Sequence, residues 1–185
     1  MKNKTIVLGV SASVAAYKSA QLVSEFKKKG ITVHVVMTKN STEFITPLTM
    51  QVLSGNPVHT DTMKEAAADK VNHIALAQNC DLVLIAPATA NIIGKLSNGI
   101  ADDMLTTVCM AVPIDTPKII APAMNTKMYE QPVTVDNLNK LKSYGYEEIK
   151  PISEMLACGD VGIGALAPVT EIVDYVVDKL SIQNA

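Results

Sequence analysis

Five short polar side chains follow apolar segments of the chain, and their hydroxyl and amide groups could bind a phosphate or another polar ligand. They are, in chain order, Ser11, Ser13, Thr38, Thr89 and Asn91. None of these side chains is charged, so a neutral, hydrogen-bonding ligand with a single phosphate suits the set best. Each could equally be a helix cap or a turn residue. Only a fold that brings them together would make them a site.

The segment Gly9–Ser13 combines one glycine with two serines just before a predicted helix. Backbone N–H groups at the start of a helix favour phosphate, and Ser11 and Ser13 could add donors. The segment lacks the G-x-G-x-x-G pattern, so a dinucleotide is poorly supported and a single phosphate fits better. A serine that caps the helix is an equally good interpretation.

Two further side chains could act on a substrate. Asn125 follows an apolar run that ends at Pro122, and its amide can donate a hydrogen bond to a carboxylate, although turn asparagines are common. His73 precedes an apolar stretch. A single histidine of this kind is more often structural or exposed than catalytic.

The cysteines fall into two classes. Cys158 lies in A-C-G-D within the glycine-rich stretch Glu154–Ala167, and a thiol on an exposed loop suits chemistry better than packing. Cys80 and Cys109 lie beside apolar segments and are expected to pack as small hydrophobic residues.

The clearest strand in the sequence is the continuous apolar run Leu82–Ala86. A run without alternation is typical of a parallel strand covered by helices on both faces. Pro87 is expected to end this strand because proline has no N–H to donate. Since open α/β sheets bind ligands at the carboxyl ends of their strands, Pro87–Asn91 should line any site.

Strands and helices alternate along the rest of the chain. The other predicted strands are Thr5–Gly9, Thr32–Met37, Lys118–Ala121 and Glu147–Ile149. The predicted helices are one ending near Lys29, two short ones within Asn40–Gly55, then His73–Gln78, Asn91–Asn98, Asp102–Val112, Val133–Tyr144 and about Val169–Leu180. This alternation predicts one α/β domain over residues 1–185, a three-layer, doubly wound parallel sheet of the Rossmann-like or flavodoxin-like type. The stretch Glu154–Ala167 has three glycines and no periodicity, so it is expected to be a mobile flap.

Composition narrows the class of protein. The chain has 185 residues, 48% of them hydrophobic, which is enough for one core. The formal net charge of −2 offers no basic field for nucleic acid. The sequence shows neither a signal peptide nor an apolar stretch of membrane-spanning length, so a cytoplasmic protein without membrane contact is expected. The cysteines form no C-x-x-C pair, and no metal site is expected.

A series of motifs occurs in an order that resembles one known family. The motifs are G-V-S-A-S-V-A-A-Y-K, H-I-A-L-A, A-P-A-T-A-N-I-I-G-K, N-G-I-A-D-D, P-A-M-N-T-K-M-Y and A-C-G-D-V-G-I-G. Together they resemble the flavin-containing cysteine decarboxylases from Lys4 to about Leu180. P-A-M-N-x-x-M alone is moderately specific, and its pairing with A-C-G-D is highly specific within the fold.

The resemblance implies an FMN cofactor and a set of site residues. Contacts to FMN are expected at Gly9, Ser11, Ser13, Thr38, Phe44, Ala86, Thr89, Ala90, Asn91 and Ile92. His73 is implied as the active-site base, Cys158 as the proton donor, and Asn125 as a catalytic residue that binds the substrate together with Met128. A homotrimer, or a homododecamer built from trimers, is also implied, with each FMN between neighbouring subunits.

The motifs are most similar to those of family members that convert 4'-phosphopantothenoylcysteine to 4'-phosphopantetheine in coenzyme A biosynthesis. Simple loss of CO2 from a cysteine carboxylate leaves a carbanion without an electron sink. Oxidation of the CH2–SH group to a thioaldehyde, with FMN as oxidant, provides that sink. In the mechanism that the resemblance implies, loss of CO2 then gives an enethiolate, which Cys158 would protonate before hydride returns from the reduced cofactor. The flap must close to place the acid and exclude water.

Three positions differ from the usual family pattern. Asp103 stands in A-D-D where the family often has A-D-N, which bears on the flavin pocket or a trimer contact. Ala165 and Leu166 follow the flap where many members have Arg-Met, which bears on its hinge. Neither difference removes a proposed catalytic group. The sequence ends where bifunctional relatives continue into a synthetase domain, so a stand-alone decarboxylase is expected.

Other functions remain open at this point. A peptidyl-cysteine decarboxylase would share P-A-M-N but is not expected to have the A-C-G-D flap. A flavin prenyltransferase would lack P-A-M-N-x-x-M and offer a basic site. A non-enzymatic flavin-binding regulatory subunit usually has charged tails, which this sequence does not show. A flavodoxin-like electron carrier would require neither Cys158 nor Asn125.

Overall fold

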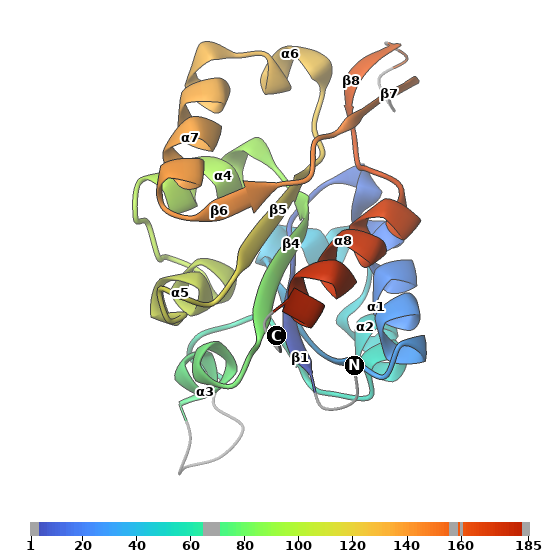
Figure 1. The fold of residues 1–185 in the computed structure, drawn as a ribbon, viewed down its shortest axis with the longest axis vertical. Helices are drawn as coiled ribbons and strands as arrows, with labels where there is room; N and C mark the ends of the chain where they lie inside the picture. The colour runs from blue at the N-terminus through green and yellow to red at the C-terminus, as the bar shows by residue number, and fades with distance from the viewer. Residues whose placement is uncertain (1–3, 65–70, 156–158, 160, 183–185) are drawn as a thin grey trace.

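The computed structural model describes residues 4–64, 71–155, 159 and 161–182 (Figure 1). Its centre is a parallel sheet in the order β3-β2-β1-β4-β5-β6. The strands are β1 (Thr5–Val10), β2 (Thr32–Met37), β3 (Val58–His59), β4 (Leu82–Ala88), β5 (Lys118–Pro122) and β6 (Tyr146–Glu148). This order is that of the Rossmann fold, in which the winding direction reverses between β1 and β4.

Helices cover both faces of the sheet. They are α1 (Lys18–Lys28), α2 (Pro47–Ser54), α3 (Asn72–Gln78), α4 (Ala90–Ser97), α5 (Met104–Ala111), α6 (Thr126–Tyr129), α7 (Pro132–Ser143) and α8 (Val169–Ile182). Two short 3-10 helices, η1 (Val14–Tyr17) and η2 (Lys39–Glu43), follow β1 and β2. The prediction of a three-layer parallel α/β fold is confirmed.

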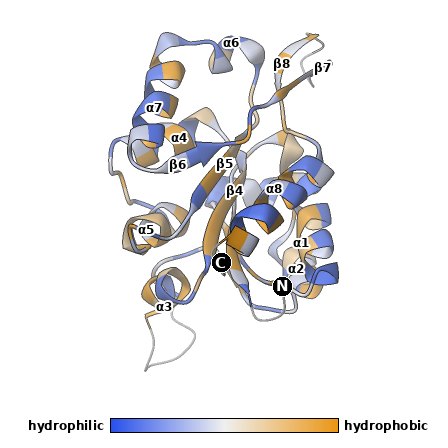
Figure 2. Cartoon of the chain, viewed as in Figure 1, coloured by the Kyte–Doolittle hydropathy of each residue, from blue (hydrophilic) through white to orange (hydrophobic). Residues whose placement is uncertain are grey.

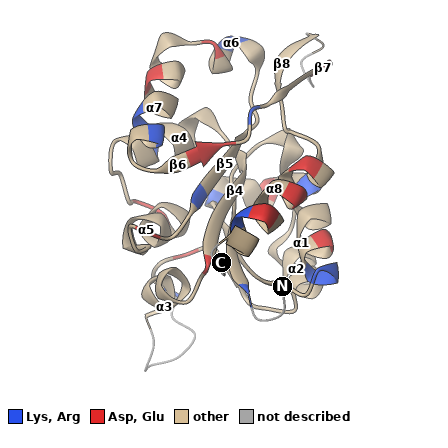
Figure 3. Cartoon of the chain, in the orientation of Figure 1, with Lys and Arg blue, Asp and Glu red and all other residues tan. Residues whose placement is uncertain are grey.

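The core lies in two layers, one on each side of the sheet. Alternate strand residues such as Leu8 and Leu84 pack with α1, α2 and α8, whereas Val7 and Ile85 pack with α3, α4, α5 and α7. The central strands are therefore apolar throughout, while the outer helices are apolar on one side only (Figure 2). Acidic and basic residues intermingle on α1 and α8, as the small net charge leads one to expect (Figure 3).

The predicted end of the central strand at Pro87 is wrong. β4 continues through Pro87 to Ala88, and its pairing with β5 shifts register between Ile85 and Ala88. Proline is tolerated at such an irregularity because its missing N–H is not needed by the ladder. The Pro87 carbonyl accepts hydrogen bonds from both the backbone N–H and the hydroxyl of Ser11, which ties β1 to β4.

The glycine-rich stretch predicted as a mobile flap overlaps two strands that pair as a β-hairpin. β7 (Ile152–Met155) and β8 (Val161–Ala165) pair antiparallel beside α6 (Figure 1). Residues 156–158 and 160 lie outside the described part of the chain. The glycines of β8 concealed the strand because they remove the alternation of side chains by which strands are recognised. Leu166 is 1% exposed and anchors the end of the hairpin in the core.

Candidate functional site

The carboxyl ends of β1, β2 and β4 open onto a cavity of about 560 Å³, a typical volume for a small-molecule site. Of the predicted site residues, those that line it are Ser11, Ser13, Thr38, Thr89, Ala90, Asn91 and Met128. The fold therefore brings together most of the polar residues selected from the sequence. The cavity lies at the switch point between β1 and β4, where α/β sheets of this kind bind ligands.

Thr38 carries the clearest sign that the cavity accepts a ligand. Its Oγ1 is buried and has no hydrogen-bond partner among the described residues. The residue precedes η2, yet its side chain makes no capping hydrogen bond. A buried hydroxyl without a partner is unfavourable. A polar ligand in the cavity would supply the missing partner.

The Ser11 hydroxyl forms its hydrogen bonds within the chain. Its hydroxyl donates to the Pro87 carbonyl at 2.7 Å and accepts from the Thr89 backbone N–H at 3.0 Å, and its side chain is 1% exposed. Ser11 therefore positions the β4–α4 turn. Ser13 caps η1 by accepting from the Ala15 N–H at 3.3 Å, which leaves its hydroxyl hydrogen available to a ligand.

The start of α4 forms one wall of the cavity. Thr89 caps this helix by accepting from the Ile92 N–H at 3.4 Å, and Ala90 and Asn91 form its first turn. The first N–H groups of a helix have no acceptor within the helix and carry a partial positive charge. This wall therefore favours an anionic or electron-rich group.

Lys95 and Asp103 also line the cavity and were not selected as ligand-binding residues from the sequence. The Lys95 ammonium group donates to Asp102 at 2.6 Å and to Asp103 at 2.9 Å. The hydrogen bond to Asp102, supported by that to Asp103, raises the pKa of Lys95. Asp103 also caps α5 by accepting from the Thr106 N–H at 2.9 Å. Its two carboxylate oxygens are therefore both used within the chain, one by Lys95 and one by the helix cap.

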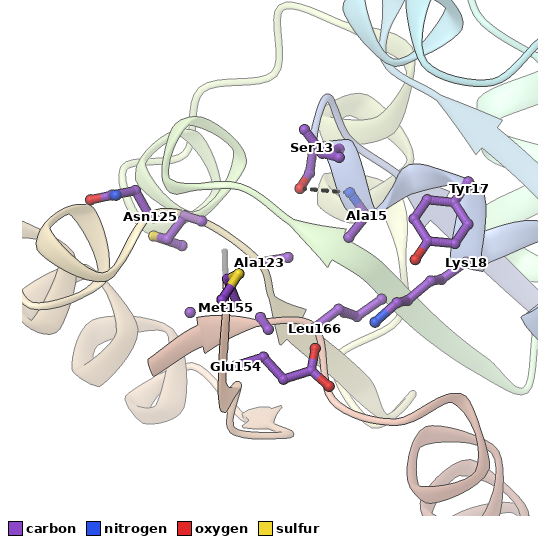
Figure 4. Close-up of a pocket in the computed structure, with 13 residues that line it drawn as sticks. Ser13, Ala15, Tyr17, Lys18, Ala123, Asn125, Glu154, Met155 and Leu166 are labelled. Carbon is purple, nitrogen blue, oxygen red and sulfur yellow. Dashed lines mark hydrogen bonds between the residues drawn. The ribbon is translucent and has the colours of Figure 1, made fainter. Parts of the chain in front are cut away.

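A second cavity of about 330 Å³ lies between the start of α1, the turn after β5 and the hairpin (Figure 4). Asn125 stands on one side of it, and Tyr17 and Lys18 stand on the other. Ser13, Ala123 and Met124 line both cavities. The predicted substrate residue and the predicted cofactor residues therefore meet at a shared wall.

The Asn125 side chain has a defined orientation. Its Oδ1 caps α6 by accepting from the Lys127 N–H at 2.9 Å. With the oxygen used in this way, the Nδ2 amino group is the donor end of the side chain. Asn125 therefore serves as both turn residue and candidate substrate contact, the two interpretations that the sequence left open.

Four residues predicted to contact the cofactor line neither cavity. Ala86 and Ile92 are fully buried in the core. Gly9 is in close contact with α5, since a Cβ at this position would stand 2.5 Å from Leu105 Cδ1. Phe44 is 48% exposed at the end of η2. In the structure, Ala86, Ile92 and Gly9 therefore have a role in packing.

Within one chain, His73 does not lie with the other candidate site residues. It lies at the start of α3, which packs beside α5, and it lines neither cavity. Its Nδ1 is buried without a hydrogen-bond partner among the described residues. Cys158 lies outside the described residues, so its predicted role stays a prediction.

The model of the flavoprotein family matches residues 1–181. The chain belongs to the flavoprotein family. Among curated proteins, it is 51% identical over 177 residues to a "Probable phosphopantothenoylcysteine decarboxylase" of Streptococcus mutans, covering 96% of this chain and 99% of the relative. It is also 46% identical over 166 residues to the "Coenzyme A biosynthesis bifunctional protein CoaBC" of Bacillus subtilis, covering 90% of this chain but 40% of that protein.

Solved flavoprotein structures have the same fold. A mutant "PPC decarboxylase" complexed with pantothenoylaminoethenethiol superposes with a TM-score of 0.86 at 34% identity, covering 95% of this chain and 97% of the other. "The FMN binding protein AtHal3" superposes with a TM-score of 0.82 at 34% identity, covering 95% and 96%. Within the described residues, no helix is long and apolar enough to span a membrane, and no group of three potential metal ligands occurs.

Proposed function

We propose that this flavoprotein catalyses the FMN-dependent decarboxylation of 4'-phosphopantothenoylcysteine to 4'-phosphopantetheine in coenzyme A biosynthesis. The observation that carries the proposal is the shared wall of Ser13, Ala123 and Met124 between a hydroxyl-lined cavity and a cavity that contains Asn125. A cofactor in the first and a cysteine carboxylate in the second would meet there. The full-length match to the Streptococcus mutans relative supports the same activity.

The residues of the larger cavity fit FMN. The unpartnered Thr38 hydroxyl, the Ser13 hydroxyl and the first turn of α4 would bind polar and anionic groups of the cofactor. FMN, when bound, supplies reversible hydride exchange with the CH2–SH group of the substrate. Lys95, further along α4, adds no net positive charge to the cavity, because it pairs with the two carboxylates of Asp102 and Asp103.

The chain's own residues bind and enclose the substrate. The amino group of Asn125 would donate to the carboxylate that leaves as CO2. The hairpin residues Glu154, Met155 and Gly164 line the same cavity and would exclude water from it. We assign Cys158, between β7 and β8, as the acid that protonates the enethiolate carbon.

We further propose that the active unit is a homotrimer, or a homododecamer of trimers, in which His73 of one subunit serves as the base in the site of another. His73 lines neither cavity of its own chain. Apolar residues next to it are exposed on the single chain, with Val71 50% and Ile74 37% accessible. A subunit contact over the start of α3 would bury these residues together with the His73 ring.

The proposed activity can be tested on the purified protein. The absorbance spectrum and the flavin released on denaturation test the cofactor, and CO2 release tests the reaction. Two substrates should be compared: 4'-phosphopantothenoylcysteine and a peptide with a C-terminal cysteine. Turnover of the first alone is expected. Turnover of the peptide alone would indicate a peptidyl-cysteine decarboxylase, and a protein that binds no FMN would contradict the proposal.

A further inference from the structure

β8 lies so close to the Asn125 turn that side chains are excluded from two of its positions. A Cβ at Gly162 would stand 2.5 Å from Thr126 Oγ1 and 3.0 Å from Thr126 Cγ2. A Cβ at Gly164 would stand 2.2 Å from the Met124 carbonyl oxygen. Glycine at these positions allows two backbone segments to approach closely. The described part of the hairpin is therefore seated directly on the turn that carries Asn125.

A hydrogen bond fixes this arrangement. The Met124 N–H donates to the Gly164 carbonyl at 3.0 Å, and Met124 and Gly164 both line the smaller cavity. Asn125 is the next residue along the chain and caps α6. A displacement of β8 would therefore be transmitted through one residue to Asn125, the side chain proposed to bind the substrate.

The Thr126 side chain lies directly beside β8. Its Oγ1 is buried and has no partner among the described residues. What its side chain does is fill the space beside Gly162 and so set how closely β8 approaches.

We propose that Thr126 and Gly162 are positioning residues for the decarboxylation, and that their contact sets the depth at which β8 seats on the Asn125 turn. The inference rests on the proposed function, since the substrate contact of Asn125 is part of it. Neither residue needs to touch the substrate. The pair acts by holding Asn125 and the covering strand in one relative position.

A double-mutant experiment on the intact flavin-loaded protein tests the pair. The variants are Gly162→Ala, Thr126→Ala and the two combined, with Gly94→Ala as a matched control. A Cβ at Gly94 would meet nothing closer than Asn137 Nδ2 at 3.7 Å, so this control adds the same methyl group without a clash. The readouts are bound flavin, Tm, kcat and KM with 4'-phosphopantothenoylcysteine, and hydrogen exchange at the Met124 amide.

Gly162→Ala should lower kcat/KM by about ten- to a hundredfold, since small misplacements at a reacting centre have effects of that size. Exchange at Met124 should quicken, while bound flavin stays at the wild-type value. Thr126→Ala removes the two nearest atoms and leaves only Cβ at 3.2 Å, so the double variant should recover most of the kcat/KM and Met124 protection of Thr126→Ala alone. The same change should not rescue Gly164→Ala, because the clash there is with a backbone oxygen.

The result that overturns the inference is an active wild type whose Gly162→Ala variant keeps wild-type kcat/KM and Met124 exchange. A double variant no better than Gly162→Ala would also overturn it. A wild type that takes up FMN but releases no CO2 from 4'-phosphopantothenoylcysteine overturns the proposed function instead, and the assay of the unmodified protein distinguishes the two failures.

Discussion

Asn125 combines a structural bond and a proposed substrate contact in one amide group. Replacement by aspartate separates them, because a carboxylate can still accept from the Lys127 N–H but cannot donate. We expect Asn125→Asp to keep its fold and its FMN while losing most of its turnover. The lost donor bond to a charged group is worth about 1.5–3 kcal/mol, and repulsion from the substrate carboxylate adds to it. Flavin content and CO2 release measure the two effects, and near-normal activity would reduce Asn125 to a turn residue.

Thr38 should affect cofactor binding and not the stability of the fold. Its hydroxyl has no partner among the described residues, so Thr38→Val removes no bond that the chain itself makes. We expect FMN affinity to fall by about ten- to a hundredfold, the loss of one hydrogen bond to a polar or charged group. Excess FMN should restore activity.

The matched control for Thr38 is Thr42→Val in η2, the 3-10 helix that Thr38 precedes. The Thr42 hydroxyl donates to the Lys39 carbonyl, and the residue does not line the cavity. Titration of FMN into the flavin-free proteins compares the two variants. Equal affinities would mean that the cofactor lies elsewhere.

Cys80 and Cys109 should be unreactive in the folded protein. Burial raises the pKa of Cys80 to about 11 and that of Cys109 to about 12. Only the thiolate reacts with alkylating reagents, so a raised pKa means less reactive thiol at any pH below it. At pH 8 we expect peptides containing these cysteines to stay unmodified until denaturant is added. Mass spectrometry after a short exposure to iodoacetamide checks this. Rapid modification without denaturant would show that these thiols are accessible and reactive in the folded protein.

At the scale of elements, Gly9 determines how closely β1 packs against α5. A Cβ at Gly9 would stand 2.5 Å from Leu105 Cδ1, and Leu105 is fully buried. We expect Gly9→Ala to lower the free energy of unfolding by about 1–3 kcal/mol, the usual cost of overpacking a core. In a Leu105→Val background the cost should shrink, since the clashing atom is gone. Urea denaturation of the flavin-free proteins measures both values, and equal costs in the two backgrounds would mean that Gly9 serves another purpose.

At the scale of the whole molecule, the position of His73 makes the subunit contact testable. His73→Asn and Asn125→Asp should each be inactive alone. Mixed oligomers of the two variants should recover up to about a quarter of wild-type activity, because some sites then receive both intact side chains from different subunits. Co-expression followed by light scattering and CO2 assay measures assembly and activity together. An active wild type that scatters as a monomer would contradict this arrangement.

The sequence by itself determined the three layers of the fold and much of the site. The buried run at Leu82 and the alternation of strands with helices predict a parallel sheet, and ligands of such sheets bind at the carboxyl ends of the strands. Local pattern is sufficient for these inferences because side-chain periodicity follows from the geometry of each element.

Only the tertiary structure decided which candidates share a space. Ser11 and Thr38 look alike in sequence, yet one hydroxyl is bonded to Pro87 and Thr89 while the other has no partner among the described residues. Proximity arises from packing between segments far apart in the chain, and no local pattern encodes it. For the same reason, the sequence did not predict the contact of Gly162 with Thr126 or the position of His73 away from the two cavities.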